Sequence, residues 1–481
     1  MTQTVDRTST TELRVTRQTR HHVGGWRDGA GQRQVVVRDP ATGTATCTMV
    51  PATDAEVDEA VRLARTTSPT WQRTSPAERA AVVRAAAQRV RDCADELTAL
   101  TTSEMGRPAD LARGGVDAGA STMEQYAELG PLHRGRSLQG GWDAVDLMVP
   151  QARGVVAVCT PWNDPVAVPA GLLAAALVTG NTVVFKPSER TPLTGERLAQ
   201  TFLDELPEGV LTLVHGDAET GAALSGHDDV DVVCHVGSTA AGRAIAAAVA
   251  QTGAKALLEN GGKDPMIVDA GVDPVWAAQQ AALGGFINSG QLCTAVERVY
   301  VHEHVADAFV EALVREAKAT QLGPMVDERM RTAVHQQVHQ ALESGARAVV
   351  GGSVPEGPGA YYPATVLTGV TPDMSVMRDE TFGPVVPVMT VGSFGEALEL
   401  ACDSPYGLAA TVLTPSMANA QRAWRELPVG TVKVNAVFGG APGGAAQPRG
   451  ASGDGFGYGP ELLDELTVTK VVHLGQAPLA Q

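Results

Sequence analysis

Cysteine and aromatic residues are scarce in this chain of 481 residues. It has six cysteines, too few and too dispersed for a disulfide scaffold. None lies in a Cys-x-x-Cys motif or beside histidines at zinc-site spacing, so we expect a reducing, cytoplasmic location and no metal. Aromatic residues make up 4% of the chain, whereas glycine occurs 52 times. The core must therefore be built from small, closely packed side chains, as where helices lie on a parallel sheet.

Positive charge and long apolar runs are also in short supply. Lys and Arg together number 37 against 54 Asp and Glu, a net charge of −17, so we expect neither a nucleic-acid nor a membrane-surface partner. No uninterrupted apolar stretch reaches the roughly 18 residues that a membrane-spanning helix needs. Residues 1–21 are rich in Thr and Arg and contain no apolar run. They are expected to form a disordered tail rather than a secretory signal.

Helix-starting signals appear early in the chain. Residues 53–56 (Thr-Asp-Ala-Glu) and 75–78 (Ser-Pro-Ala-Glu) are capping boxes, each of which opens a predicted helix. The second helix is predicted to run to about Leu100. Residues 131–152 are rich in Gly and Arg with short alternating stretches, which predicts strands that leave the main body.

From Arg153 onward, short β-branched runs alternate with Ala-rich helical segments. Strands are expected at 154–160, 181–186, 210–215, 231–236, 256–258, 266–268 and 298–301, and helices at 165–179, 192–206, 238–252, 275–287 and 305–320. This alternation is typical of parallel, doubly wound sheets. It predicts two α/β domains joined near residue 260.

One junction between a strand and a helix suits a dinucleotide. The usual Gly-x-Gly-x-x-Gly fingerprint is missing, and Val236-Gly237-Ser238-Thr239-Ala240-Ala241-Gly242 stands in its place. Gly237 permits a tight turn and Ser238 can cap the helix, whose free N–H groups and dipole favour a pyrophosphate.

A polar, Gly-containing segment, residues 286–295, carries Cys293 between a helix and a strand. In such a segment a thiol can be exposed and its thiolate stabilised. This segment, 258–263 (Leu-Glu-Asn-Gly-Gly-Lys), 160–165 (Thr-Pro-Trp-Asn-Asp-Pro), 186–189 (Lys-Pro-Ser-Glu), the Gly237 turn and 380–384 (Glu-Thr-Phe-Gly-Pro) occur in this order. Together they resemble the NAD(P)-dependent aldehyde dehydrogenase superfamily over about residues 24–473.

The resemblance implies an α/β fold of the aldehyde dehydrogenase type, with two doubly wound α/β domains and a small β oligomerisation element. A NAD-binding domain would comprise 22–130 and 153–259, and a catalytic domain 260–452. The oligomerisation element would combine 131–152 with 453–481, where Thr467–His473 is a predicted strand. An exposed strand of this kind favours pairing, so we expect a homodimer or homotetramer.

The resemblance also implies a reaction, the NAD-dependent oxidation of an aldehyde to its carboxylic acid. Cys293 would attack the aldehyde to form a thiohemiacetal and, after hydride loss, a thioester. The Asn163 amide and the Cys293 N–H would stabilise the oxyanion. Glu259 would activate the water that hydrolyses the thioester.

Eight residues are implied at the cofactor. Lys186 and Glu189 would reach the adenosine ribose, and because a carboxylate repels a 2′-phosphate, Glu189 favours NAD while leaving NADP open. Glu380 would bind the nicotinamide ribose and Phe382 would lie beside the ring. The full predicted set is Trp162, Lys186, Ser188, Glu189, Gly237, Ser238, Glu380 and Phe382.

Three departures from the family pattern leave the aldehyde open. Asp164 stands where many relatives have an aromatic side chain that lines the substrate tunnel, Arg449 lies in an altered C-terminal loop, and Phe456-Gly457 replaces a common Arg-Glu pair. The alternatives are a CoA-acylating dehydrogenase, whose relatives lack a glutamate at the position of Glu259, and a non-catalytic structural or binding protein.

Overall fold

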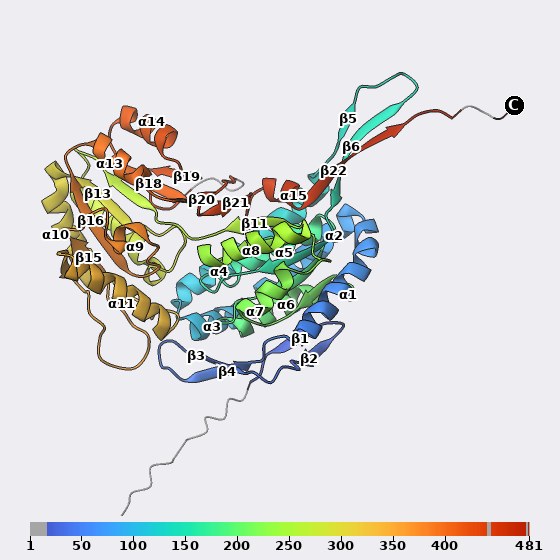
Figure 1. Ribbon diagram of the computed structural model, residues 1–481, viewed down its shortest axis with the longest axis horizontal. Helices are drawn as coiled ribbons and strands as arrows, with labels where there is room; N and C mark the ends of the chain where they lie inside the picture. Colours follow the sequence, from blue (N-terminus) through green and yellow to red (C-terminus); the bar gives the residue numbers. More distant parts are fainter. Residues whose placement is uncertain (1–16, 440–443, 478–479, 481) are drawn as a thin grey trace, which may run out of the picture.

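The computed structural model describes residues 17–439, 444–477 and 480, and two large sheets dominate it (Figure 1). The first sheet has the order β2-β1-β9-β8-β7-β10-β11-β21. Its strands are β1 (Arg20–His22), β2 (Trp26–Asp28), β7 (Val155–Cys159), β8 (Thr182–Lys186), β9 (Leu211–Leu213), β10 (Val232–Val236), β11 (Lys255–Glu259) and β21 (Gly453–Asp454). The five central strands (β9, β8, β7, β10 and β11) are parallel to one another, and the outer strands β1, β2 and β21 pair antiparallel with their neighbours.

Eight helices accompany this sheet. They are α1 (Asp54–Arg73), α2 (Pro76–Asp92), α3 (Ala94–Met105), α4 (Ala109–Leu129), α5 (Ala167–Val178), α6 (Pro192–Leu203), α7 (Ala218–Ser225) and α8 (Thr239–Thr252). Both capping boxes are confirmed at the starts of α1 and α2. The prediction of one helix to Leu100 is wrong, because the backbone leaves helical geometry at Cys93 (φ −106°, ψ 21°) and α3 begins after it.

Small side chains let the helices approach this sheet closely. Residues 169–178 of α5 are all buried, and α5 packs against α4 through positions such as Gly119 and Gly171, where a side chain would meet the neighbouring helix. The expected core of small residues is therefore present.

The second sheet has the order β14-β15-β16-β13-β12-β18-β19. It is formed by β12 (Pro265–Val268), β13 (Arg298–His302), β14 (Arg347–Val350), β15 (Thr365–Thr368), β16 (Val385–Val391), β18 (Ala409–Leu413) and β19 (Thr431–Val434). The helices of this half are α9 (Pro274–Phe286), α10 (Glu303–Ala319), α11 (Glu328–Glu343), α12 (Ser375–Arg378), α13 (Phe394–Cys402) and α14 (Met417–Glu426). All pairs except β14–β15 are parallel.

A small antiparallel sheet projects from the body, formed by β5 (Arg136–Leu138), β6 (Val145–Ala152) and β22 (Thr467–Leu474) (Figure 1). The two segments that the sequence assigned to one element thus pair directly, from Thr467 with Ala152 to Leu474 with Val145. The remaining elements are β3 (Val35–Arg38), β4 (Ala45–Met49), β17 (Tyr406–Gly407), β20 (Arg449–Gly450), α15 (Glu461–Glu465) and short 3₁₀ turns at 130–132 and 287–290.

Two boundaries differ from the sequence interpretation. The predicted tail 1–21 is wrong at its end, because Arg20 and His21 already belong to β1, which pairs with β2 and β9; residues 1–16 lie outside the described residues. Gly453 and Asp454, assigned to the oligomerisation element, pair with β11 in the first sheet. The division into domains otherwise stays a prediction. In the part of the chain that the structure describes, no helix is long and apolar enough to cross a membrane.

The first sheet brings four segments to one edge. From β7 the chain passes to β8 and then to β9 on one side of β7, whereas β10 and β11 lie on its other side. The direction in which the strands are added to the sheet therefore reverses between β7 and β10. Open α/β sheets bind ligands at the carboxyl ends of strands near such a reversal. Residues 160–163, 186–189, 237–238 and 259 follow or end the strands at this edge.

Candidate active site

The loop that carries Cys293 has an unusual backbone. Asn288, Ser289 and Gly290 have φ angles of 51°, 56° and 70°, three left-handed residues in succession. Gly290 fits because any side chain there would overlap the Gly383 carbonyl. The loop is further held by Gln291, whose Oε1 accepts the Val326 N–H at 2.9 Å. Strained conformations of this kind persist where the surrounding structure holds them, often at functional sites.

Asn163 lies across from this loop. Its side chain is 8% exposed, and its Nδ2 donates to the Gln291 carbonyl at 3.2 Å. Its own carbonyl accepts a hydrogen bond from Arg107 Nη1 at 3.1 Å. The structure therefore brings the predicted oxyanion donor to the segment of the predicted nucleophile.

Glu259 is the last residue of β11, and it lines the same cavity of about 290 Å³ as Cys293. Its Oε1 accepts the Gly457 N–H at 3.0 Å. Burial raises the pKa of Glu259 to about 7, and the Gly457 hydrogen bond opposes that rise. A carboxyl group that titrates near neutrality is suited to general-base catalysis.

The Cys293 thiol does not meet the expectation of a stabilised thiolate. Burial, together with the nearby carboxyl groups of Asp264, Glu259 and Glu380, raises its pKa to about 12. The prediction of a stabilised thiolate is therefore wrong, because the polar sequence around Cys293 does not reveal that the fold places the thiol among acidic groups. The thiol needs a base to become a nucleophile.

Glu380 and Phe382 belong to a turn that Glu297 holds in place through hydrogen bonds. The Thr381 and Phe382 N–H groups each donate to the Glu297 carboxylate at 2.8 Å. Lys263 Nζ donates to the same carboxylate at 2.8 Å. Glu380 Oε1 accepts the Gly262 N–H at 3.1 Å, and burial raises its pKa to about 8. This anchoring fixes the turn against the segment that follows β11.

Trp162, which follows β7 of the first sheet, contacts Phe382, which precedes β16 of the second sheet. Their ring centroids lie 5.4 Å apart in an edge-to-face arrangement. The Arg190 guanidinium lies 5.4 Å from the Trp162 ring centroid and pairs with Asp327 at 3.0 Å. The predicted residues of the nicotinamide end thus lie together between the two sheets.

The remaining predicted cofactor residues follow β8 and β10. Lys186 is buried, and its Nζ donates to the Pro187 and Gly216 carbonyls at 3.2 and 3.1 Å. Ser188 is buried and Glu189 is half-buried. Gly237 precedes Ser238, whose hydroxyl accepts the Ala241 N–H at 3.3 Å at the start of α8. All eight predicted residues therefore lie at or beside the carboxyl edge of the first sheet or on the 380–382 turn.

Comparison with known proteins identifies the family. The sequence model of the aldehyde dehydrogenase family matches residues 26–472. The chain belongs to this family. It is 36% identical over 465 residues to lactaldehyde dehydrogenase of Escherichia coli (strain K12), covering 93% of this chain and 96% of that enzyme. It is also 36% identical over 471 residues to 3,6-anhydro-alpha-L-galactose dehydrogenase of Streptomyces coelicolor, covering 92% and 93% of the two chains.

A solved structure agrees with this assignment. Betaine aldehyde dehydrogenase of Staphylococcus aureus in complex with NAD⁺ superposes with a TM-score of 0.92 at 29% identity, covering 96% of both chains. The resemblance, the fold class and the reaction class, aldehyde oxidation, are thereby confirmed. The roles of individual residues stay predictions.

Sequence reasoning missed several residues that shape the site of this aldehyde dehydrogenase. Arg107 pairs with Asp164 at 3.0 Å and anchors Asn163, and Glu297 anchors the 380–382 turn. Tyr126 lines the cavity from α4. Arg107 and Glu297 are ordinary charged residues in the sequence, and their partners lie 56 or more and 34 or more positions away, so no local motif marks them.

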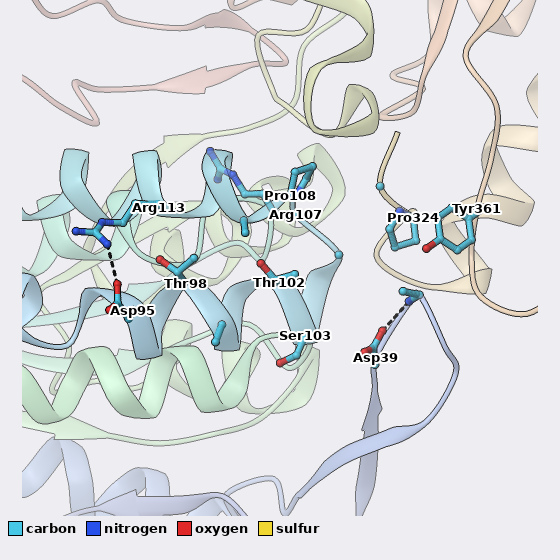
Figure 2. A pocket seen from close by; sticks show the side chains of 15 residues that line it. Asp39, Asp95, Thr98, Thr102, Ser103, Arg107, Pro108, Arg113, Pro324 and Tyr361 are labelled. Carbon is cyan, nitrogen blue, oxygen red and sulfur yellow. Dashed lines mark hydrogen bonds and ion pairs between the residues drawn. The ribbon is translucent and has the colours of Figure 1, made fainter. Parts of the chain in front are cut away.

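A second, larger hollow of about 680 Å³ lies between α3, the start of α4 and the segments around Pro324 and Tyr361. Figure 2 shows Arg113 paired with Asp95 along its wall, at 2.8 Å. Of the aldehyde dehydrogenase site residues named above, Arg107 lines this hollow, and Cys293 and Glu259 do not. Arg107 thus contacts Asn163 of the site while it also lines the second hollow.

Proposed function

We propose that Cys293, Asn163 and Glu259 carry out the oxidation of an aldehyde to its carboxylic acid, with NAD as the acceptor of hydride. The observation that supports this most directly is that Cys293 and Glu259 line one cavity, while the Asn163 amide reaches the loop of Cys293. The overall balance is aldehyde, NAD⁺ and water to carboxylic acid, NADH and a proton.

Cys293 would act first. Since its pKa of about 12 keeps the thiol protonated, Glu259, with a pKa of about 7, is the base that can remove the proton before attack. The sulfur then bonds to the carbonyl carbon, and the oxygen becomes an oxyanion. Asn163 Nδ2 would donate to that oxygen in place of the Gln291 carbonyl, together with the Cys293 N–H.

Bound NAD supplies the two-electron acceptor that makes a thioester of the Cys293 adduct possible. Once Glu259 has released the thiol proton to solvent, it would take a proton from water. The hydroxide would add to the thioester carbonyl and displace the Cys293 sulfur, which regains a proton from Glu259. Gly457 lets its N–H approach the Glu259 carboxylate closely, because any side chain there would overlap Glu259.

The residues at the sheet edge fit NAD. The first N–H groups of α8 face outward at its N-terminus, as in any helix, and suit a pyrophosphate. The Thr239 hydroxyl in this first turn is buried without a partner among the described residues. Lys186 and Glu189 would hold the ribose hydroxyls. Because Arg190 is engaged by Asp327 and Trp162, it does not offset the charge of Glu189, which supports NAD over NADP.

We also propose a cytoplasmic homodimer or homotetramer that assembles through β5, β6 and β22. Val468, Val471 and Leu474 on β22 are 42%, 67% and 57% exposed. A strand with exposed apolar side chains favours pairing with a second copy. The cytoplasmic location is supported by six free cysteines.

The proposed roles are tested by following NADH formation with purified variants. Cys293→Ala should abolish oxidation and keep NAD binding, whereas Cys402→Ala, a half-buried cysteine at the end of α13, should leave the rate unchanged. Glu259→Gln should give, at high pH, a burst of at most one NADH per site followed by a very slow rate, because the thioester accumulates.

Two results would overturn these assignments. Activity in Cys293→Ala would remove the nucleophile, and absence of both a burst and an acyl adduct on Cys293 at every pH would remove Glu259 from hydrolysis. Adding CoA tests the acylating alternative, which requires a thiol-dependent increase in the steady rate.

A further inference from the structure

We propose that the substrate is an uncharged aldehyde with an apolar body of ring size, such as an aryl aldehyde, and not a short hydroxyaldehyde or a carboxylate-bearing semialdehyde. This inference rests on the proposed function, because it takes the cavity of Cys293 and Glu259 as the substrate site. It concerns what the walls of that cavity can accept.

The walls offer an anionic substrate no counter-charge. Among the described residues that line the cavity, Glu259 is the one with a carboxylate, and none has a cationic side chain. Residues 440–443, which lie outside the described part, are Gly, Ala, Pro and Gly. A carboxylate on the substrate would lose its water without gaining an ion pair, which is strongly unfavourable.

The two cations that the sequence places near the site do not line the cavity, although the charges of Asp264 and Cys293 act on Lys433 and oppose the lowering of its pKa by burial. Lys433, two residues after the cavity-lining Thr431, donates through Nζ to the Val437 carbonyl at 2.9 Å. Arg449 is exposed and belongs to β20, which pairs with β17. Among the described residues, the cavity wall therefore offers no side-chain cation to an anionic substrate, and the Glu259 carboxylate in that wall would repel one.

Asp164 does not bring a charge into the cavity either. One of its carboxylate oxygens pairs with Arg107 at 3.0 Å, and the other accepts the Ala167 N–H at 3.2 Å. Arg107 lines the second hollow and not the substrate cavity (Figure 2). The position at which many relatives carry an aromatic tunnel residue therefore holds a short, neutralised side chain outside the cavity.

The helix that follows leaves further space. α5 contributes Ala167, Val168, Gly171 and Leu172 to the cavity wall, and Leu172 is the one large side chain among these four. Opposite Gly171 lies Thr122 of α4, and a Cβ added at Gly171 would meet the Thr122 methyl group at 3.3 Å. The cavity measures about 290 Å³, and an apolar cavity of about 150 Å³ already suffices to bind benzene.

Two tyrosines give this space aromatic walls. Tyr126 is 1% exposed, and its hydroxyl donates to the Gly459 carbonyl at 3.2 Å. Because that hydroxyl is engaged, Tyr126 offers the cavity its ring rather than a hydrogen bond. Tyr458 also lines the cavity and is 46% exposed, as expected of a ring near the opening. Aromatic pairs favour edge-to-face and offset stacking, which a substrate ring can join.

The first test is a substrate panel with the unmodified protein and NAD. Benzaldehyde, phenylacetaldehyde and cinnamaldehyde are compared with lactaldehyde, and hexanal with succinic semialdehyde, by kcat/KM. The aryl aldehydes should exceed lactaldehyde at least ~10-fold, and hexanal should exceed succinic semialdehyde by ~10². Each methylene added to a straight-chain aldehyde should raise kcat/KM about fourfold until the cavity is full.

Two variants test the cavity itself. Gly171→Leu fills the space opposite Thr122 and should lower kcat/KM for cinnamaldehyde at least ~10-fold more than it lowers kcat/KM for propanal. Thr122→Arg places a cation in the cavity and should improve the ratio of succinic semialdehyde to hexanal at least ~10-fold. Ser121→Arg is the matched control, because Ser121 is the exposed neighbour on the same helix and does not line the cavity.

The outcomes separate this inference from the proposed function. A kcat/KM for lactaldehyde or succinic semialdehyde above that for the apolar aldehydes would overturn the proposed substrate class but not the proposed reaction. Equal effects of Thr122→Arg and Ser121→Arg would show that the cavity is not the substrate site. If no aldehyde in the panel yields NADH, although NAD binds, the proposed function itself fails.

Discussion

The steady rate of aldehyde oxidation should depend on the ionisation of Glu259. Burial raises the pKa of this carboxyl group to about 7, against an ordinary value of 4.5. Its ionised form is the base that activates water, so the rate should rise with pH. With a pKa near 7, the ionised fraction is about one-tenth at pH 6 and about nine-tenths at pH 8. The steady rate should therefore increase roughly tenfold over that range if hydrolysis limits turnover.

The assay is stopped-flow absorbance of NADH, which resolves the burst from the steady phase in one trace. Recording the traces from pH 5.5 to 9 gives the pKa of each phase separately. Glu259→Gln is the control, because an amide has no titration there and its slow steady phase should lose the inflection near pH 7. A fully solvated Glu259 would instead titrate near its ordinary value and leave the rate flat over this range.

Gly457→Ala gives an independent structural test of the same carboxylate. The added methyl would overlap the Glu259 side chain and disturb the hydrogen bond from the residue 457 N–H. The steady phase should slow more than the burst, since water activation demands the carboxylate position more strictly. A steady rate that changes less than twofold between pH 6 and 8, or an unchanged inflection in Glu259→Gln, would refute the reasoning.

Much of the fold was predictable because strands and helices of a doubly wound sheet leave local patterns. The strands β7, β8, β10 and β13 begin and end within one or two residues of their predicted bounds. β7 and β8 are buried along their whole length, so they appear in the sequence as unbroken β-branched runs.

The prediction named no helix after residue 320, so α11 to α15 were missed. Two helices in the first half of the chain, α4 and α7, were missed as well. α7 has eight residues, and its apolar pattern is too short to stand out. α4 has Gly or Ala at five of its eight buried positions, because it packs closely on α5. This second omission matters, since α4 supplies Thr122 and Tyr126 to the substrate cavity.

The site divides in the same way between local and long-range information. Cys293, Asn163 and Glu259 stand out because each is a reactive or polar residue in a segment with recognisable neighbours. The raised pKa of Cys293 depends on burial among Asp264, Glu259 and Glu380, which come from two segments (259–264 and the 380–382 turn) other than the one that carries Cys293. No local sequence pattern can encode the electrostatic field of these groups. The nucleophilic role of the thiol was therefore predicted from the sequence, whereas the direction of its pKa shift was predicted wrongly.

Three further predictions concern the frame around these groups. Gly290→Ala should lower both Tm and kcat, because the residue has φ +70° and its methyl would overlap the Gly383 carbonyl; differential scanning calorimetry and steady-state kinetics measure the two effects. Glu189→Ser should narrow the preference for NAD over NADP in kcat/KM by ~10-fold, since one like-charge contact with the 2′-phosphate is removed. Arg107→Met should slow the NADH burst by about 10-fold to 10²-fold, because Asn163 loses the anchor on its carbonyl and its amide no longer meets the oxyanion in a fixed position. KM should change much less than the burst rate, since Arg107 does not line the substrate cavity. Arg107→Lys retains one donor and should recover part of the burst. If KM rose by the same factor as the burst rate fell, or if Arg107→Lys recovered none of the burst rate, Arg107 would only support the fold and would not position Asn163.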